Sequence, residues 1–215
     1  MTSLTVRDAA ERGDLGAFVA RVVRLDQRAT VRLRASGGRV TAWASTPFDV
    51  LATRSVHGLL EPGDVTVPAT GLLTALAVER AETVDPGAGG LWQGELPPDE
   101  GWAPVDDVPA GELDALTERG LVLARENAGP LGPPASLLDQ IVLTVTATSG
   151  PAIKIPLRCL FALSGMGFLG DTGAGGAGGA VGAVRVSATG TWLRLDARYG
   201  AVVRRRVTAL PLLLA

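Results

Sequence analysis

The sequence predicts an α+β fold in which antiparallel β hairpins pack against a few helices, arranged in two lobes. Short runs of alternating apolar and polar residues, separated by glycine turns, predict antiparallel strands. A few other runs carry apolar residues at helical spacing. A Pro- and Gly-rich acidic stretch at 83–109 separates an N-terminal α+β lobe, 1–82, from a C-terminal α+β lobe, 110–215.

The N-terminal lobe is expected to begin with an amphipathic helix at 14–25, with Asp14 as its N-cap. A hairpin follows at 30–43, because Ser-Gly-Gly separates two alternating runs. The other elements expected here are strands at 48–56 and 65–67 and a helix at 72–78.

The connecting segment 83–109 holds most of the acidic excess, together with Trp92 and Trp102. Two tryptophans in such a segment anchor it to a surface, and we expect that surface to belong to the chain itself. A helix is expected next, at 110–126, where leucines supply an apolar face despite Gly120.

The most apolar stretch of the chain, 137–169, is expected to form the core of the C-terminal lobe. Alternation over 141–148 and 153–155 around a Ser-Gly-Pro turn predicts a hairpin, with the side chains of Ile141, Leu143 and Val145 directed inward. Pro156 suits the first turn of a following apolar helix.

The segment 170–182 is glycine-rich but has neither the Lys-Ser/Thr pair of a P-loop nor the strand and helix that flank a dinucleotide-binding loop. We expect it to be a flexible loop. Three short antiparallel strands are expected after it, at 183–187, 191–196 and 201–207.

Composition limits the classes of function. No apolar leader or run of 18 apolar residues is present, so neither secretion nor membrane insertion is expected. Cys159 is the only cysteine, which excludes an intrachain disulfide and makes a cytoplasmic location the default. The 20 basic residues include one lysine, Lys154. This bias indicates a GC-rich genome and resembles uncharacterised proteins of actinobacteria, with no characterised family identified.

Candidate catalytic groups are few. His57 is the only histidine, and Cys159 falls within an apolar helix, where a buried inert thiol is the common case. The carboxylates of Asp99, Glu100 and 106–107 lack EF-hand spacing and read as a solvated acidic loop. We therefore expect no catalytic residue, no metal site and no cofactor, and an enzyme is only the third reading of function.

The basic residues of the last strands are the main candidate binding site: Arg185, Arg194, Arg198, Arg204, Arg205 and Arg206. Alternation along a strand places Arg204 and Arg206 on one face and Arg205 on the other. One reading is that these arginines dock on the acidic middle of the chain. In the other reading, the apolar helix and basic hairpin form a winged-helix-like unit that binds nucleic acid.

Two weaker patterns concern the architecture. The segment 63–76, GDVTVPATGLLTAL, resembles the strand-into-helix segment of sliding-clamp domains, although the chain is too short for the usual three clamp domains. The pentapeptides at 24–28 and 194–198 are alike, and each half has an apolar helix followed by a hairpin that contains a tryptophan, Trp43 or Trp192. A duplicated αββ unit would account for this likeness.

These observations predict a non-catalytic, cytoplasmic protein-interaction or binding module. Its expected partner is another protein or a second copy of the chain in a homodimer, with no membrane. The alternative is a nucleic-acid-binding regulator of winged-helix-like type that uses the basic C-terminal hairpin. Nucleic acid is the less favoured partner, because the helix before that hairpin lacks polar side chains to read base edges.

Overall fold

A single eight-stranded sheet runs through both halves of the chain. The computed structural model describes residues 2–78, 81–130, 132–147, 151–170 and 182–206. The strands of this sheet are β2 (Thr30–Ser36), β3 (Arg39–Ser45), β4 (Leu51–His57), β6 (Asp64–Pro68), β8 (Ala103–Pro109), β11 (Ala183–Ala188), β12 (Trp192–Ala197) and β13 (Gly200–Arg205). Their order is β6-β2-β3-β4-β13-β12-β11-β8, and every neighbouring pair is antiparallel. The predicted α+β class with antiparallel hairpins is confirmed.

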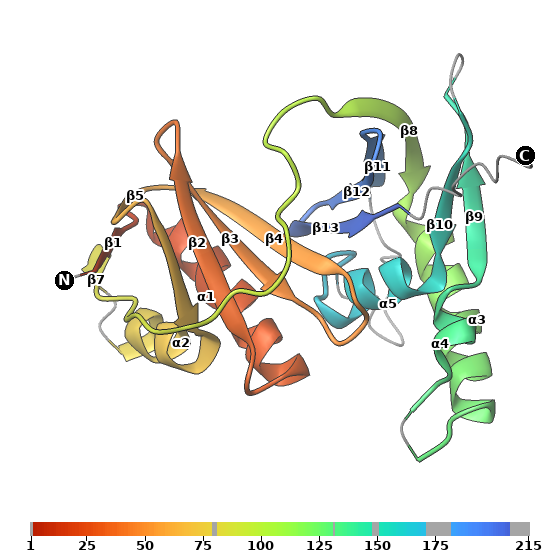
Figure 1. Cartoon of the computed structure of the whole chain (residues 1–215), viewed down its shortest axis with the longest axis horizontal. Coiled ribbons are helices and arrows are strands. Elements are labelled where there is room, and N and C mark those ends of the chain that lie inside the picture. The colour runs from red at the N-terminus through yellow and green to blue at the C-terminus, as the bar shows by residue number, and fades with distance from the viewer. Residues whose placement is uncertain (1, 79–80, 131, 148–150, 171–181, 207–215) are drawn as a thin grey trace, which may run out of the picture.

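The helices form two pairs on one face of the sheet (Figure 1). They are α1 (Ala9–Leu25), α2 (Ala69–Val78), α3 (Ala110–Glu126) and α5 (Leu157–Gly165), with one short turn, α4 (Ala135–Leu138). Helix α1 packs against α2 and β4, whereas α5 packs against α3 and β13. In the part of the chain that the structure describes, no helix has both the length and the apolar character needed to cross a bilayer.

Alternation along the strands explains why the helices lie on this face. Ala44, Ala52, Val202 and Leu195 lie opposite one another on β3, β4, β13 and β12, and each is at most 1% exposed. They belong to one apolar core that also contains Leu15 and Phe18 of α1 and Leu160 and Leu163 of α5. Their neighbours along each strand point to the opposite face of the sheet.

The two halves meet where β4 pairs with β13. Only three residue pairs form this seam: Leu51 with Val203, Ala52 with Val202 and Thr53 with Ala201. Aromatic contacts support it on the helix side, because Phe18 stacks on Phe168 with centroids 6.3 Å apart and Phe48 meets Phe161 edge-on at 5.9 Å. Side-chain packing on the helix side therefore adds to the short backbone pairing that joins the halves.

Two small sheets lie at opposite ends of the molecule (Figure 1). One has the order β5-β1-β7 and is built from Leu59–Glu61, Ser3–Thr5 and Thr83–Val84. The other is the hairpin of β9 (Ile141–Val145) and β10 (Ile153–Pro156). Ile141 was expected to point inward but is 48% exposed, because β9 is the outer strand of a two-stranded hairpin; Val145 is buried as predicted.

The structure corrects the predicted start of the first helix. Helix α1 begins at Ala9 rather than Asp14, because the Asp8 carboxylate accepts the backbone N–H groups of Ala10 and Glu11 and caps the helix there. Asp14 instead lies within the helix, where its carboxylate pairs with Arg54.

Other boundaries were predicted more closely. Helix α3 spans the predicted 110–126, and the three terminal strands begin and end within two residues of their expected bounds. The expected loop at 170–182 falls mostly outside the described residues. The segment 83–109, expected as a connection, contributes β7 and β8 at its two ends. The intervening residues 85–102, called here the strap, cross the sheet face that carries no helices (Figure 1).

Candidate functional site

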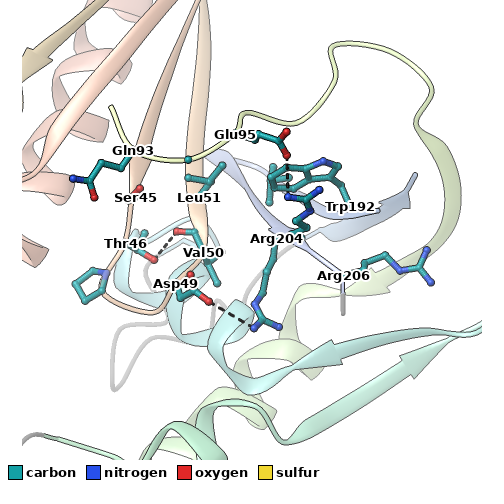
Figure 2. A pocket seen from close by; sticks show the side chains of 14 residues that line it. Ser45, Thr46, Asp49, Val50, Leu51, Gln93, Glu95, Trp192, Arg204 and Arg206 are labelled. Atoms are coloured by element: carbon teal, nitrogen blue, oxygen red, sulfur yellow. Dashed lines mark hydrogen bonds and ion pairs between the residues drawn. The ribbon is translucent and has the colours of Figure 1, made fainter. Parts of the chain in front are cut away.

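A cleft of about 660 Å³ opens at the seam between the two halves, and we call it the junction cleft (Figure 2). Three parts of the chain form its walls: the β3–β4 turn, the strap, and the ends of β12 and β13. The lining residues are Ser45, Thr46, Pro47, Asp49, Val50 and Leu51 of the turn and its flanking strand ends, Gln93, Gly94 and Glu95 of the strap, and Trp192, Val203, Arg204, Arg205 and Arg206. Both halves of the chain are therefore needed to make this site.

The β3–β4 turn is held in one conformation by hydrogen bonds to Thr46. Its backbone N–H and its hydroxyl both donate to the Val50 carbonyl, at 3.0 and 2.8 Å. The N–H of Asp49 donates to the Thr46 carbonyl at 3.2 Å, and Asp49 has a φ of 57°, in the left-handed region. This backbone directs the Asp49 carboxylate toward β13 and α5.

Two arginines and two aspartates form a charge cluster beside the cleft. Arg158 of α5 has only 8% of its side chain exposed, and its guanidinium contacts Asp139 at 2.8 Å and Asp49 at 3.4 Å. Arg204 of β13 contacts the same carboxylates, at 3.3 and 3.7 Å. Arg158 also donates to the Phe48 carbonyl at 2.8 Å. The cluster ties the β3–β4 turn to α5 and thereby fixes one wall of the cleft.

The strap is anchored by its tryptophans, as predicted. Trp92, Leu96 and Trp102 pack against Trp43, Trp192 and Val203 on the outer face of the sheet. The Trp102 indole N–H donates to the Pro98 carbonyl at 3.0 Å. Arg205 adds an ion pair with Glu95 at 2.9 Å and lies over the Trp192 ring, 5.9 Å from its centroid.

The predicted arginine site is not one patch. Arg204 extends toward the helix side and Arg205 toward the strap, as alternation requires. Arg185 pairs with Asp107 at 3.1 Å, so each of these three arginines contacts a carboxylate in the acidic middle of the chain, residues 82–140. The others have different contacts: Arg194 pairs with Asp196 and lies over Trp102, Arg198 lies over Tyr199, and Arg206 donates to the Thr189 carbonyl. Only 204–206 meet, at the junction cleft.

His57 takes part in a hydrogen-bonded chain at the end of β4. Its Nδ1 lies 2.7 Å from the Glu11 carboxylate, and its Nε2 lies 2.9 Å from Arg39. Since a guanidinium only donates, Nε2 accepts and Nδ1 carries the proton that is donated to Glu11. The hydrogen bond from His57 lowers the pKa of the Glu11 carboxyl group. Both ring nitrogens of His57 are thus engaged, by Arg39 and by Glu11, and these contacts close the end of β4.

The other candidate chemical groups have structural surroundings. Burial raises the pKa of the Cys159 thiol to about 12, so almost no thiolate forms at neutral pH. The acidic cluster is dispersed: Asp99 pairs with Arg34, and Asp107 pairs with Arg185. Across the described residues, no three His, Cys, Asp or Glu side chains gather in a way that could hold a metal ion.

The arginines and tryptophans of the junction cleft were singled out from the sequence, but the β3–β4 turn that forms its other wall was not. The strand predicted to start at Phe48 starts at Leu51, because residues 46–50 form the turn. Pro47 directly after Thr46 was the available signal, since proline favours the second position of a turn. No local signal pointed to Asp139, which reaches Arg158 and Arg204 only in the folded chain.

Comparison with family models gives two matches that together cover most of the chain. A model described as "Domain of unknown function (DUF8185)" matches residues 97–209, and one described as "Domain of unknown function (DUF8010)" matches residues 1–93. A comparison with curated proteins gave no match.

Solved structures of sliding clamps share the fold. The DNA polymerase sliding clamp of Caulobacter crescentus aligns with a TM-score of 0.58 and 17% identity, over 98% of this chain and 67% of that one. The Bacillus subtilis sliding clamp gives 0.55 and 15%, over 98% and 65%. The DNA polymerase III β subunit of Thermotoga maritima gives 0.51 and 12%, over 98% and 65%. The chain spans about two thirds of the length of these structures.

This likeness agrees with the resemblance read from 63–76, which forms β6 and most of α2. It overturns both functions predicted from the sequence, the general protein-interaction or binding module and the winged-helix-like regulator. The β12–β13 hairpin cannot act as the wing of a winged helix, because both strands are paired on both sides within the large sheet. The helix before them, α5, is buried from Leu157 to Leu163 and offers no face to a DNA groove.

Proposed function

We propose that this chain, which belongs to the family described as a domain of unknown function (DUF8185), is a clamp-type DNA tether. In this proposal several copies enclose a DNA duplex, and closure of the assembly keeps them on the DNA. The observation that carries the proposal is the clamp fold, which extends over both halves of the chain and across the seam between them.

The surface charges favour retention on DNA by enclosure of the duplex over retention by electrostatic attraction. The exposed charged side chains on the helices are balanced in sign: Arg24, Arg119 and Arg125 against Glu112, Glu118 and Glu126. On the opposite face, several arginines already have carboxylate partners, including Arg32, Arg185 and Arg194. Phosphate contacts by Lys and Arg supply most non-specific DNA affinity. With few such contacts available, topology would have to hold the protein on DNA.

The two ends of the molecule support assembly into such an enclosure. Strand β5 carries Leu59 at one end, 59% exposed, and β9 carries Ile141 at the other, 48% exposed. Both strands lie at sheet edges, where unpaired backbone groups can pair with another chain. Because the two ends differ, a contact between them would be head-to-tail, and such contacts close into rings when the rotation per subunit allows it.

The test is retention on plasmid DNA recovered from the native host, where any loading factors are present. Tagged protein should stay on closed circular plasmid at about 1 M NaCl, where the Debye length falls to about 3 Å. A single restriction cut should release it, because an enclosing protein slides off a free end. Leu59→Lys and Ile141→Lys should abolish retention and assembly together, while Val122→Lys, on the exposed face of α3, serves as the control. Protein that washes off the closed circle, or stays bound after cutting, contradicts the proposal.

Three further features belong to the same proposal. The partners are DNA and further copies of the chain, in a homodimer or a larger ring. The location is the cytoplasm, and the origin is actinobacterial, as the composition suggested. The division into lobes at 1–82 and 110–215, joined by 83–109, is also part of it; the two family models meet between residues 93 and 97, inside that connection, which supports this division.

A further inference from the structure

A second cavity, of about 390 Å³, lies between α3 and α5 on the helix side of the sheet, and we call it the helix groove. The two helices lie side by side (Figure 1). The β3–β4 turn contributes the Phe48 ring to its wall, and the loop after α3 contributes Ala128 and Pro133. No described residue lines both this groove and the junction cleft, so the two are separate sites.

The groove exists because small residues stand where larger side chains would fill the space. At Gly120 the two helices touch, since a Cβ atom there would lie 2.4 Å from a Leu157 methyl carbon. One turn further along α3 the lining residue is Ala124, and α5 presents Ser164 and Gly165. Apolar pockets of about 300–1,000 Å³ are the usual sites of small-molecule ligands, and this groove falls within that range.

The wall of the groove is almost wholly apolar. The rings of Phe48 and Phe161 meet edge-on, with centroids 5.9 Å apart, and Leu121 adds aliphatic surface. Thr117 also lines the groove, but its hydroxyl donates to the Leu113 carbonyl one turn earlier in α3, at 2.7 Å. An occupant therefore needs a hydrocarbon body, because a polar one would lose its hydrogen bonds to water without replacement.

The charged groups beside this apolar surface are cations. Arg125 of α3 lines the groove, and Arg24 of α1 donates to the carbonyl of Gly165, another lining residue, at 2.9 Å. Both arginines are exposed and, within the described parts of the chain, neither has a carboxylate at salt-bridge distance. No carboxylate stands among the described lining residues either. The charge of the rim thus complements an anionic group.

We infer that the helix groove binds a small apolar acid, a molecule with a hydrocarbon body and one carboxylate. The body packs against Phe48, Phe161 and Leu121, and the carboxylate pairs with the Arg125 guanidinium at the rim. Phe48 belongs to the N-terminal half, whereas α3 and α5 belong to the C-terminal half. A bound acid therefore contacts both halves and raises the Tm of the chain. This binding is independent of whether the chain encloses a duplex.

Other occupants match the groove less well. A DNA phosphate could pair with Arg24 or Arg125, but a duplex has no hydrocarbon group to place against the two phenylalanine rings. A stable protein interface engages roughly 20–30 residues on each side, whereas ten described residues line this groove. The size and chemistry of the groove therefore favour a small molecule.

The test uses straight-chain carboxylates from hexanoate to dodecanoate, each kept below the concentration at which it forms micelles. Binding to the full chain is measured by titration calorimetry, with Tm as a second readout. Each added methylene should raise the affinity about fourfold until the groove is full, because every buried CH₂ contributes a similar free energy. An affinity that does not depend on chain length, or no binding at all, would overturn the inference.

Variants separate the apolar body from the carboxylate. Arg125→Gln should weaken decanoate about threefold or more and leave decanol unchanged, because only the acid pairs with the guanidinium. Decanoate binding that Arg125→Gln does not alter would contradict the acid. Ser164→Leu and Ala128→Leu each fill the groove from a different wall and should abolish binding of both ligands, with Tm as the check on folding. Binding that survives both changes would place the ligand elsewhere.

Controls separate the groove from general effects and from assembly. Arg119→Gln removes an exposed arginine of α3 that does not line the groove and should leave decanoate affinity unchanged. Leu59→Lys should also bind decanoate normally, so failure of DNA enclosure and failure of this inference are distinguishable. Sedimentation with phosphatidylglycerol vesicles that decanoate does not compete with would assign the apolar surface to a membrane and overturn the inference.

Discussion

The two halves of the molecule reach the same arrangement by opposite routes along the chain. In the N-terminal half, α1 is followed by β2, β3 and β4, and the strand-helix pair β6–α2 comes afterwards. In the C-terminal half, the strand-helix pair β8–α3 comes first, and α5 is followed by β11, β12 and β13. Each half thus forms four neighbouring strands of the large sheet, covered by two helices. The last strand of each three-strand run, β4 of β2–β4 and β13 of β11–β13, forms the seam. The architecture is thus shared, while the order of its parts is not.

The two three-strand runs, β2–β4 and β11–β13, explain one part of the internal likeness seen in the sequence. Trp43 on β3 and Trp192 on β12 occupy equivalent strands, the middle ones of each run, and pack in the same cluster. The two similar pentapeptides are not equivalent, because 24–28 ends α1 and enters a turn, whereas 194–198 lies mostly within β12. The tryptophans mark the relation between the halves, and the pentapeptide likeness is incidental.

The helices of the two halves also differ in whether their packing leaves room for a side chain at their glycines. Gly120 in α3 faces α5 so closely that a Cβ atom there would lie 2.4 Å from a Leu157 methyl carbon and 3.2 Å from the Phe161 ring. Gly13 in α1 has no neighbour within 4 Å of that position. One glycine is required for helix packing, and the other is not. Substitutions at these and two further glycines test this difference.

The largest effect is expected at the seam itself. In Gly200→Ala, a Cβ atom would lie 2.5 Å from the Phe168 ring and 2.9 Å from the Thr53 carbonyl oxygen, at a φ of 158°. We expect a loss of about 3 kcal/mol or somewhat more, seen as a Tm lower by about 6–12 °C. Gly190→Ala, in the neighbouring hairpin turn with open space around it, is the matched control. Equal melting of the two variants would show that the seam is loosely packed.

A smaller loss is expected for Gly120→Ala. The added methyl group must displace the flexible end of Leu157, which is 1% exposed and has little room to move. Overpacking of this kind costs about 1–2 kcal/mol, partly offset by the higher helix propensity of alanine. The measurement is urea unfolding, with the slope m compared to confirm that only stability has changed. A stabilised variant would contradict the close packing of α3 on α5.

The opposite sign is expected for Gly13→Ala in the other half. Alanine at an exposed helix position without clashes should stabilise the fold by about 0.5–1 kcal/mol, through its lower conformational entropy cost. The same urea titration serves as the measurement. Loss of stability would mean that a contact unseen here requires the glycine.

The smallest loss of stability per titrating carboxyl group is expected on acidification, and it should affect mainly the N-terminal half. Asp8 and Glu11 have a lowered pKa, through backbone N–H groups that donate to the first and the hydrogen bond from His57 to the second. Asp64 follows, through its hydrogen bond from Arg32. A carboxyl group with a lowered folded-state pKa stabilises the fold above its unfolded pKa and loses that contribution as the pH falls through the folded value.

Hydrogen exchange followed by mass spectrometry between about pH 6 and pH 3 would test this, after correction for the intrinsic pH dependence of exchange. Protection should fall first at the start of α1 and along β2 and β6, below about pH 4, where carboxyl groups begin to protonate. Earlier loss in β11 and β12 would show that acid acts elsewhere.

Local signals explain which parts of the fold could be predicted. Helix α3 was expected at its observed bounds because leucines at helical spacing follow a proline and precede a glycine-rich break. The Ser-Gly-Gly turn likewise set the β2–β3 hairpin, with Gly37 and Gly38 both at positive φ. The seam had no such signal, because pairing of β4 with β13 joins residues about 150 positions apart in the sequence. The junction cleft exists only because of that pairing.

The same seam has a consequence for the order of events during synthesis. Strand β4 emerges from the ribosome early, but its partner β13 follows only after about 150 further residues. Until then one edge of the N-terminal half-sheet is unpaired, a condition that favours association with other nascent chains. Contacts between residues so distant in sequence form slowly. Slower translation should therefore lengthen the period in which chaperones can bind the N-terminal half of the incomplete, nascent chain.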